Sequence, residues 1–590
     1  MRFRREAGAA RRPARNRREV RKMTEETRSS GSLPGALPGG PLDSPLGAAS
    51  SRRDFLQRSA VATGLSGLMS LALTGAGSAQ AAQAKTLDTL IVAVQEGDTR
   101  TLDPEDADEL TVPIFLRAIY DQLLTFPGSD VTRVAPDLAT DWDVSADGLT
   151  YVFKLNPNIR FSDGTPASAD DVIFSYLRQK NLKGPASWFE NGVASITKTG
   201  QHEVTIKLGA INVDWLFLLT SPFLSIENAA VVKAHGGTAA ADAATTDTAV
   251  AWLDQHSAGS GPFVLDAWER GSQLSISRNP HYWGKQPPFN RVIFRFTQEA
   301  TVQRDLLVRG DAHFAMNLSP DIAASLKGRP NIGVLDVPSL ATVWLGINAD
   351  LNPALKNPKT WEAVKYAIDY DGMAQLYKGG GRPIASCLPP GLPNALPIEE
   401  RIRQDVPRAK AALAAAGYPN GFSMVLTYAS EQLYYNVPAS LIAAYVQENL
   451  SKVGITANLR PVPSTEELTE IRAGKAEAFI HEWGLDYVGW TDVLPVFAPG
   501  GHVSGPRQLW YPNQSAAAAK IADLSKQATS TLDPKKQRDL CYQAQRLMNQ
   551  DGPFAWLFEP FIQIGYRTDV IKSVSTNPVW YIDVGTVELV

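Results

Sequence analysis

The alternation of apolar and polar residues predicts two different arrangements of strands and helices along the chain. A continuous apolar run at 90–94 (LIVAV) is typical of a strand buried on both faces. Further on, the segment 142–155 alternates around an Asp-Gly pair, which favours a hairpin turn. Ser168 and Asp171 have the spacing of a capping box that begins a helix. Short antiparallel strands mixed with a helix indicate a separate α+β module here.

A change of composition marks the end of this module. Residues 236–260 are rich in Ala, Thr, Gly and Asp. The segments 263–268 and 274–277 that follow alternate on either side of an Arg-Gly pair, the pattern of a second β-hairpin. A helix that ends at Gly310 and a strand at 343–348 complete this part of the chain.

From about residue 348 strands alternate with longer helices. Apolar positions at helical spacing predict one helix from Trp361 to the three glycines at 379–381. A regular succession follows: a strand at 422–428, a helix at 440–454 with Gly454 as its C-terminal cap, a strand at 455–462, a helix capped by Ser464 and Glu467 that stops at Gly474, and a strand at 476–483. Because strand-helix-strand crossovers are right-handed and join parallel neighbours, we expect three parallel strands, the last ending at Trp483.

The stretch EWGLDYVGW, residues 482–490, lies just past that strand end. Ligands of open parallel sheets bind beyond the carboxyl ends of the strands, which makes Asp486 a candidate ligand contact. Aromatic side chains gathered at loops fit the lining of such a site: Trp483, Tyr487, Trp490, Tyr434, Tyr435 and Trp510. Two alternatives stay open, namely that the aromatic residues belong to the core and that Asp486 only stabilises a turn.

Charge divides the chain into a basic leader and an acidic body. Residues 1–58 hold 14 Lys and Arg against 6 Asp and Glu, whereas the remainder holds 43 basic and 55 acidic residues. An acidic body argues against nucleic acid and anionic membranes as partners, since both require a basic surface. With 590 residues and 44% hydrophobic content, the chain is long enough for two to four globular domains.

The leader has the order of an export signal. SRRDFLQRS at 51–59 precedes an uncharged run that extends to Ala84 and contains small-residue cleavage sites such as Ala79-Gln80-Ala81. The pair Arg52-Arg53 resembles a twin-arginine signal, with Gln57 in place of the usual lysine. A retained membrane anchor is the alternative, and Met23 is a second candidate start. Residues 1–84 are therefore interpreted as a disordered leader and signal.

The cysteines and a search for catalytic motifs provide little evidence about function. Cys387 and Cys541 are the only cysteines, and two unpaired buried thiols are favoured over a disulfide. The spacings of nucleophile elbows, zinc helices, dinucleotide loops and P-loops are absent, and no metal or cofactor is expected. An exported hydrolase that uses Glu482 and Asp486 as a carboxylate pair stays as a remote alternative.

Several sequence blocks resemble one family. APDLATDWDVSADGLTYVFKLNPNIRFSDGTPASADDVIFSY (135–176), GSGPFVLDAWERGSQLSISRNPHYWG (259–284), WEAVKYAID, AGYPNGF and VGITANLRPV are similar, in family order, to blocks of the family 5 extracytoplasmic solute-binding proteins of ABC importers. The resemblance covers the chain from about Leu90 to its end. That family includes binders of dipeptides, oligopeptides, nickel, haem and oligosaccharides.

The resemblance implies a two-lobed α/β periplasmic binding protein of the class II-like, cluster C type, with an inserted α+β domain and a two-strand hinge. Lobe I would comprise residues 85–107, 248–347 and 546–590, lobe II residues 348–545, and the inserted domain residues 108–247. The protein would bind its ligand without bond chemistry and dock as a monomer on the transmembrane subunits of a permease.

In peptide-binding members of the family an aspartate at the position of Asp486 pairs with the peptide ammonium group. This chain departs from the family where D-Y-P-D-P is replaced by Asp486-Tyr487-Val488-Gly489-Trp490. The resemblance therefore implies a peptide or another amine-bearing solute as ligand. An oligosaccharide or a nickel chelate is the alternative within the family, for which His481 or His502 would suit a metal.

Overall fold

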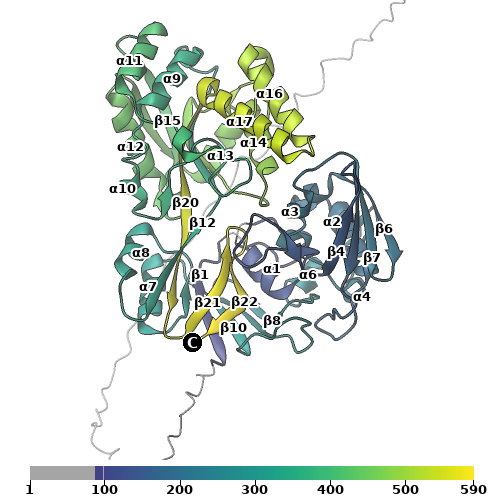
Figure 1. Cartoon of the computed structure of the whole chain (residues 1–590). Coiled ribbons are helices and arrows are strands. Elements are labelled where there is room, and N and C mark those ends of the chain that lie inside the picture. Colours follow the sequence, from purple (N-terminus) through teal and green to yellow (C-terminus); the bar gives the residue numbers. More distant parts are fainter. Residues whose placement is uncertain (1–86, 98, 110) are drawn as a thin grey trace, which may run out of the picture. The chain divides into compact units, whose positions relative to one another are not determined.

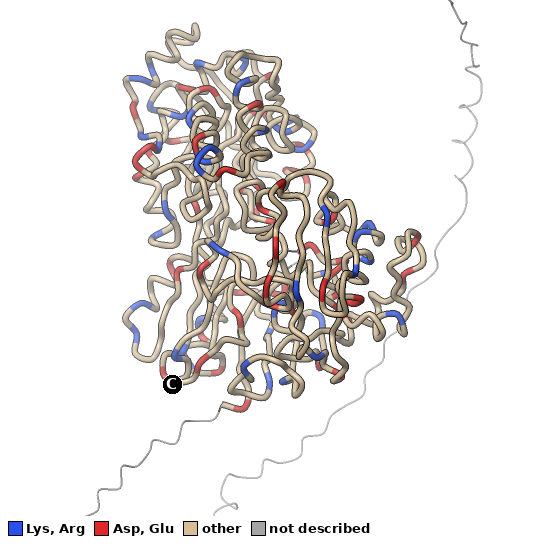
Figure 2. Tube along the Cα trace, turned by 45° about the vertical axis from the view of Figure 1, so that its right-hand side comes forward, with Lys and Arg blue, Asp and Glu red and all other residues tan. Residues whose placement is uncertain are grey.

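The computed structural model describes residues 87–97, 99–109 and 111–590. The predictions about the leader, including the twin-arginine signal, the cleavage sites and Met23, lie outside the described residues. Within the described ranges no helix is both long enough and apolar enough to span a bilayer. Lys, Arg, Asp and Glu are scattered along the trace in the view of Figure 2, without a basic face.

A twelve-stranded sheet is the largest element of the described chain. Its strands follow the order β18-β15-β19-β13-β20-β11-β1-β10-β9-β8, and β12 and β14 also pair with β20. Strand β20 (Phe554–Arg567) is 14 residues long and joins the two halves of this sheet. Its first residues pair with β13 and its last with β11 and β12, and Figure 1 shows it running from one half into the other.

The first half of the sheet contains the predicted strand at 90–94. This strand, β1, lies between β10 and β11 and is parallel to both. The predicted hairpin forms as β8 and β9, and the predicted helix α7 ends at Gly310 in a left-handed conformation. The elements are β1 (Thr89–Val94), α1 (Pro113–Ile119), β8 (Phe263–Glu269), β9 (Gln273–Arg278), β10 (Arg291–Phe296), α7 (Ala300–Arg309), β11 (Phe314–Ala315), α8 (Pro320–Leu326) and β12 (Ile332–Pro338). Strands β21 (Ile571–Asn577) and β22 (Tyr581–Leu589) pair with each other in a separate two-stranded sheet.

The predicted α+β module forms a sheet of its own. Within the described residues this sheet has four antiparallel strands in the order β4-β5-β7-β6, and Figure 1 shows α2 beside it. The predicted Asp-Gly turn joins β4 to β5, and Ser168 and Asp171 make the predicted capping box of α2. The elements are β2 (Leu124–Thr125), β3 (Ala135–Pro136), β4 (Ala139–Val144), β5 (Thr150–Leu155), α2 (Ala169–Leu182), β6 (Val193–Gly200), β7 (Glu203–Leu208), α3 (Trp215–Leu218), α4 (Ala229–Ala234), α5 (Ala243–Thr246) and α6 (Val250–Leu253).

The second half of the sheet confirms the predicted strand-helix succession. Strand β15 lies between β18 and β19 and is parallel to both, so β19 ends at Trp483 as expected. The elements are β13 (Thr342–Ile347), α9 (Pro358–Ala367), α10 (Ala374–Tyr377), β14 (Gly381–Arg382), α11 (Val406–Ala415), β15 (Ser423–Ala429), β16 (Leu433–Tyr434), β17 (Val437–Pro438), α12 (Ala439–Ser451), β18 (Thr456–Val462), α13 (Ser464–Arg472), β19 (Ala478–Trp483), α14 (Leu494–Phe497), α15 (Ser504–Gln508), α16 (Ala516–Thr529) and α17 (Pro534–Asp551).

Three predictions about helices in this half are wrong. The single helix expected from Trp361 is two, because the Asp369 side chain accepts a hydrogen bond from the Gly372 backbone N–H (2.8 Å) and interrupts the helix. Ser464 is the first residue of α13 and not its cap, since Pro463 precedes the helix without a side-chain cap. Helix α12 ends at Ser451, before the expected cap at Gly454.

The chain crosses between the two halves of the sheet at two places. One is the link from β12 to β13, and the other lies within β20 near Pro560. The two crossings are tied together: the Ser339 hydroxyl donates to the Pro560 carbonyl (2.6 Å), and the Leu340 N–H donates to the Glu559 carboxylate (3.0 Å). This is a two-strand hinge. The exact domain boundaries stay a prediction, and β13 pairs with strands of the second half.

Two large hydrophobic clusters form the core on either side of the hinge. One surrounds the β13, β15 and β19 strands, and the other surrounds β1 and the inserted sheet. Cys387 and Cys541 are both free thiols buried in the first cluster, as the favoured interpretation expected. Tyr487 belongs to the second cluster whereas its neighbour Val488 belongs to the first. The stretch after β19 therefore runs along the boundary between the two cores.

Candidate ligand-binding site

The loop after β19 folds around a residue that sequence analysis missed. The carboxylate of Asp492 accepts a hydrogen bond from the Asp486 backbone N–H (3.0 Å), and its carbonyl accepts one from the Trp483 indole (3.1 Å). Asp492 is 6% exposed, and burial, followed by the charge of Asp486, raises its pKa well above the ordinary value. Asp492 thus performs the turn-stabilising role that was one alternative for Asp486.

The Asp486 carboxylate itself has no hydrogen bond or ion pair among the described residues. Solvent reaches the side chain, yet enough protein surrounds the carboxylate that loss of water is the main cause raising its pKa to about 6. The second cause is the nearby charge of Asp108. A carboxylate that is held without a partner and next to another acid favours a cationic ligand at this position.

Asp108 comes from the opposite side of the boundary. It lies in the acid-rich segment after β1, where Arg100 forms ion pairs with Asp106 (2.7 Å) and Glu109 (3.1 Å). Asp108 also acts electrostatically on Arg100 and on Glu109. The pairing of Asp108 with Asp486 was not foreseen, because nothing in the sequence links two acids so far apart along the chain.

The same loop is bonded to the inserted module. Asp214 accepts hydrogen bonds from the backbone N–H (2.9 Å) and the hydroxyl (2.7 Å) of Thr491. The Thr491 hydroxyl also meets the Tyr487 hydroxyl (2.7 Å), and the Tyr487 ring lies 6.3 Å from that of Trp188 between centroids. Burial raises the pKa of Asp214 to about 6. The loop therefore connects the two sides of the boundary through polar and aromatic contacts.

Some of the predicted aromatic residues are buried in the core behind the loop, and others are partly exposed to solvent. Trp490 (1% exposed), Tyr434 (0%) and Trp510 (2%) are buried in the core around β19, and the Tyr434 hydroxyl donates to the Ile480 carbonyl. Trp483 is half-buried, and Tyr487 is 7% exposed. Tyr435 has a φ of +48°, which directs its ring toward the core around β1, and its hydroxyl lies near Gly484.

A cavity opens beside the loop. Its volume is about 350 Å³, and its lining residues are Gln432, Ser464, Thr465, Glu467, Leu468, His481, Glu482 and Gly484. His481 contacts the Glu467 carboxylate (3.3 Å). Burial raises the pKa of Glu482 to about 8. His502 lies apart, exposed, with its ring 6.4 Å from that of Trp483, so neither histidine is part of a group of metal ligands in the described chain.

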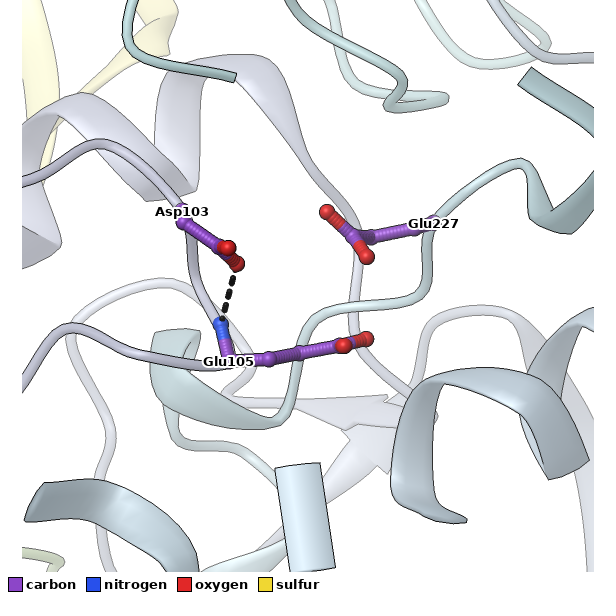
Figure 3. A group of neighbouring side chains, drawn as sticks. All are labelled: Asp103, Glu105 and Glu227. Carbon is purple, nitrogen blue, oxygen red and sulfur yellow. Dashed lines mark hydrogen bonds between the residues drawn. The ribbon is translucent and has the colours of Figure 1, made fainter. Parts of the chain in front are cut away.

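A second acidic cluster is buried between the segment after β1 and the inserted module. Figure 3 shows Asp103, Glu105 and Glu227 converging, and they are the one group among the described residues with metal-binding spacing. Arg178 already lies there, with ion pairs to Asp103 (2.7 Å), Glu105 (2.9 Å), Glu227 (3.3 Å) and Asp247 (2.8 Å). The Arg178 guanidinium supplies the positive charge that these carboxylates require. Because Arg178 belongs to α2 and the carboxylates come from three loops, the ion pairs join α2 to those loops.

Comparison with known proteins assigns the family. The model of "Bacterial extracellular solute-binding proteins, family 5 Middle" matches residues 133–503. The probable D,D-dipeptide-binding periplasmic protein DdpA of Escherichia coli K12 is 28% identical over 86% of this chain and 95% of its own length, and the dipeptide-binding protein of that strain is 27% identical over 84% and 93%. The Helicobacter pylori periplasmic binding protein DppA, solved with the peptide STSA, shares the fold with a TM-score of 0.68 at 21% identity, over 85% of this chain and 98% of its own.

Matching well over half of the chain, the family model shows that this protein belongs to the bacterial extracellular solute-binding proteins of family 5.

Proposed function

We propose that the protein captures a peptide or another amine-bearing solute between its two lobes and delivers it to the permease of an ABC importer. The observation that carries this proposal is the Asp486 carboxylate, placed at the carboxyl end of a parallel strand without a partner among the described residues. The chain is a substrate-binding protein and not an enzyme, so the hydrolase alternative for Glu482 and Asp486 is set aside.

The ammonium group of the ligand is the partner that Asp486 requires. An ammonium donates up to three hydrogen bonds, and pairing with it favours the ionised carboxylate. Trp483, which is half-buried, would contact the ligand together with Tyr435, whereas Tyr487, only 7% exposed, would hold the loop through Thr491. Trp490 and Tyr434 would act from behind, since both side chains are buried and hold the loop in place. The curated relatives that are named for dipeptides support this class of ligand.

Lobe closure follows from the position of the loop. A ligand held at Asp486 contacts lobe II and lies near Asp108 of the other side of the boundary, to which the Thr491–Asp214 hydrogen bonds already join the loop. A ligand shifts the balance toward the closed form only by the difference in its affinity for the two forms. A ligand that contacts both sides of the hinge binds the closed form more tightly than the open form, which is the required difference in affinity.

Calorimetry with a matched pair of peptides tests the proposal. The mature protein is titrated with Ala-Ala-Ala and with N-acetyl-Ala-Ala-Ala, after native mass spectrometry has shown whether a ligand is already bound. We expect acetylation to weaken binding by about thirtyfold or more, since it leaves the Asp486 carboxylate without its cation. Equal affinities for the two peptides, or no binding of either, would contradict the ammonium role.

Export and assembly belong to the same proposal. The twin-arginine pair in the leader would direct the protein through the Tat pathway to the periplasm, where it would dock on permease subunits as a monomer. Fusion of residues 1–84 to a reporter exported only by that pathway, with Arg52-Arg53 changed to Lys-Lys as the control, tests the route. Light scattering of the purified protein tests the monomer.

A further inference from the structure

We propose that the 350 Å³ cavity beside the loop is a side-chain subsite that takes a cationic group of the ligand, such as a lysine or ornithine side chain, with Glu482 as its counter-ion. This inference rests on the proposed function, because it assumes that a peptide-like ligand is bound through Asp486. It adds a preference for one class of side chain, determined by a residue other than Asp486.

The cavity is built within lobe II from three segments. Gln432 comes from the turn after β15, Ser464 to Leu468 from the start of α13, and His481 to Gly484 from the end of β19. Gly484 is two residues from Asp486, so a ligand whose ammonium group lies at Asp486 begins next to the cavity. Its volume falls within the range of small-molecule sites.

Glu482 is an acid in this cavity that no lysine or arginine of the described chain pairs with. Its Oε2 atom is buried and has no hydrogen-bond partner among the described residues. Glu467, by contrast, contacts His481 (3.3 Å) and lies in the field of Arg507. A buried acceptor without a donor is costly, and a cationic donor that enters from the ligand removes that cost.

The surroundings of Glu482 favour a cation over an anion. The groups that act on it are Glu467, Gln432, which is a neutral donor, and the phenols of Tyr434 and Tyr435. His481 lines the same cavity and contacts Glu467. The start of α13 would ordinarily attract an anion, but the Ser464 N–H already donates to the Glu431 carboxylate (2.6 Å). The second acid and the occupied helix start both oppose a negatively charged guest.

If Glu482 pairs with a cationic side chain, it must release its proton, so the affinity depends on pH. Packing of the side chain in the cavity would not cause this dependence. Burial raises the pKa of Glu482 to about 8 in the ligand-free protein, so the carboxyl is largely protonated at pH 6. A cationic side chain binds the ionised form and lowers that pKa. The advantage of a cationic peptide over its neutral counterpart should therefore grow as the pH rises from 6 to about 8.5.

Peptides that differ only in the terminal ammonium of one side chain test the subsite. The mature protein is titrated with Lys-Ala-Ala and Ala-Lys-Ala and with the same peptides carrying norleucine in place of lysine, at pH 6 and pH 8.5. We expect one lysine peptide to bind about tenfold more tightly than its norleucine partner at pH 8.5, with a smaller advantage at pH 6. Glu482→Gln should reduce that advantage to within about twofold and leave the norleucine peptide unaffected.

Two further variants separate the subsite from a structural role. Glu466→Gln removes an acid of the same helix that pairs with Arg460 (3.0 Å) and does not line the cavity, so the lysine preference should persist. Thr465→Lys places a tethered ammonium at the cavity from an exposed position and should abolish the preference without loss of the fold.

The outcomes are distinguishable. Norleucine peptides that bind as tightly as lysine peptides at both pH values would overturn the subsite and leave the proposed function standing. A Glu482→Gln protein that loses both peptides equally, with Thr465→Lys unchanged in preference, would also overturn the subsite. If none of the four peptides binds, the subsite is wrong and a tripeptide is not the ligand, which leaves another amine-bearing solute for the proposed function.

Discussion

Two acidic clusters in this protein look alike in composition and differ in how their charge is balanced. Around Arg178, four carboxylates share one buried guanidinium and are removed from solvent. Around Asp486, two neighbouring acids face a carboxylate that no cation of the described chain pairs with. The first cluster is complete within the chain, whereas the second, in the function we propose, is completed by the ammonium group of the ligand. Whether an acid is compensated internally therefore separates a structural cluster from a ligand site.

Removal of Arg178, the cation of the first cluster, should have the largest effect of the changes that test this comparison. Arg178→Met leaves buried carboxylates without their counter-ion, which should lower the free energy of unfolding by about 3–5 kcal/mol. Urea denaturation of the mature protein measures it. Arg133→Met, at an exposed ion pair with Asp130, is the matched control and should change stability by less than about 1 kcal/mol. If the two variants are equally stable, the Arg178 cluster does not hold the fold together, and the distinction between a structural cluster and a ligand site is lost.

Removal of the uncompensated acid should act on binding and not on stability. Asp486→Asn should weaken a free-amine peptide by about 2–3 kcal/mol, measured by calorimetry, because the ammonium loses its charged partner. The midpoint of thermal unfolding should hardly change, since no hydrogen bond to this carboxylate is lost within the described residues. Asp143→Asn, an exposed acid on β4, serves as the control. Unaltered affinity of the Asp486 variant would show that the ammonium lies elsewhere.

The pH dependence of peptide binding should show the titration of Asp486. Burial and the charge of Asp108 raise the pKa of Asp486 to about 6, and a bound ammonium lowers it. Below pH 6 the free carboxyl must release its proton when the ligand binds, so affinity should fall by about tenfold per pH unit. It should level off near pH 7, above which the α-ammonium of the free peptide itself begins to lose its proton. The norleucine peptide Nle-Ala-Ala is suited to this titration. A flat profile down to pH 5 would mean that Asp486 does not titrate with binding.

The smallest effect is expected at the second acid of the site. Asp108→Asn removes one cause of the raised pKa of Asp486, so the pH midpoint of peptide binding should move downward by less than about one unit. Affinity at pH 7.5 should fall only a few-fold, since Asp486 keeps its charge. Asp106→Asn, whose acid pairs with Arg100, offers a control in the same segment. An unchanged midpoint would show that Asp108 is electrostatically separate from the site.

The sequence predicted several local elements correctly, although the caps expected at Ser464 and Gly454 were wrong. The Asp-Gly turn before β5, the capping box of α2 and the parallel strands on both sides of β15 all follow from short-range patterns, and all are confirmed. The break between α9 and α10 was missed because a side chain, Asp369, competes with the helix for the Gly372 N–H. Helical spacing of apolar residues carries no information about that competition.

The site could be predicted only in part. The position of Asp486 followed from the end of a parallel strand, which is a property of the local order of elements. Asp108 and Asp214 reach the loop from the other side of the hinge, and Asp492 reaches it by folding back, so their contribution depends on tertiary structure. Glu482 was named as a candidate catalytic acid, but its lack of a partner became visible only with the cavity around it.

The shared strand β20 has a consequence for protein engineering. Its first residues complete the sheet of one lobe and its last residues that of the other, so a truncated chain that ends on either side of Pro560 deprives one lobe of a central strand. Neither lobe can therefore be transplanted as a module with a single cut. A fluorescent reporter or a new chain terminus belongs in an exposed turn of the inserted sheet, such as the one between β4 and β5, where no strand is shared.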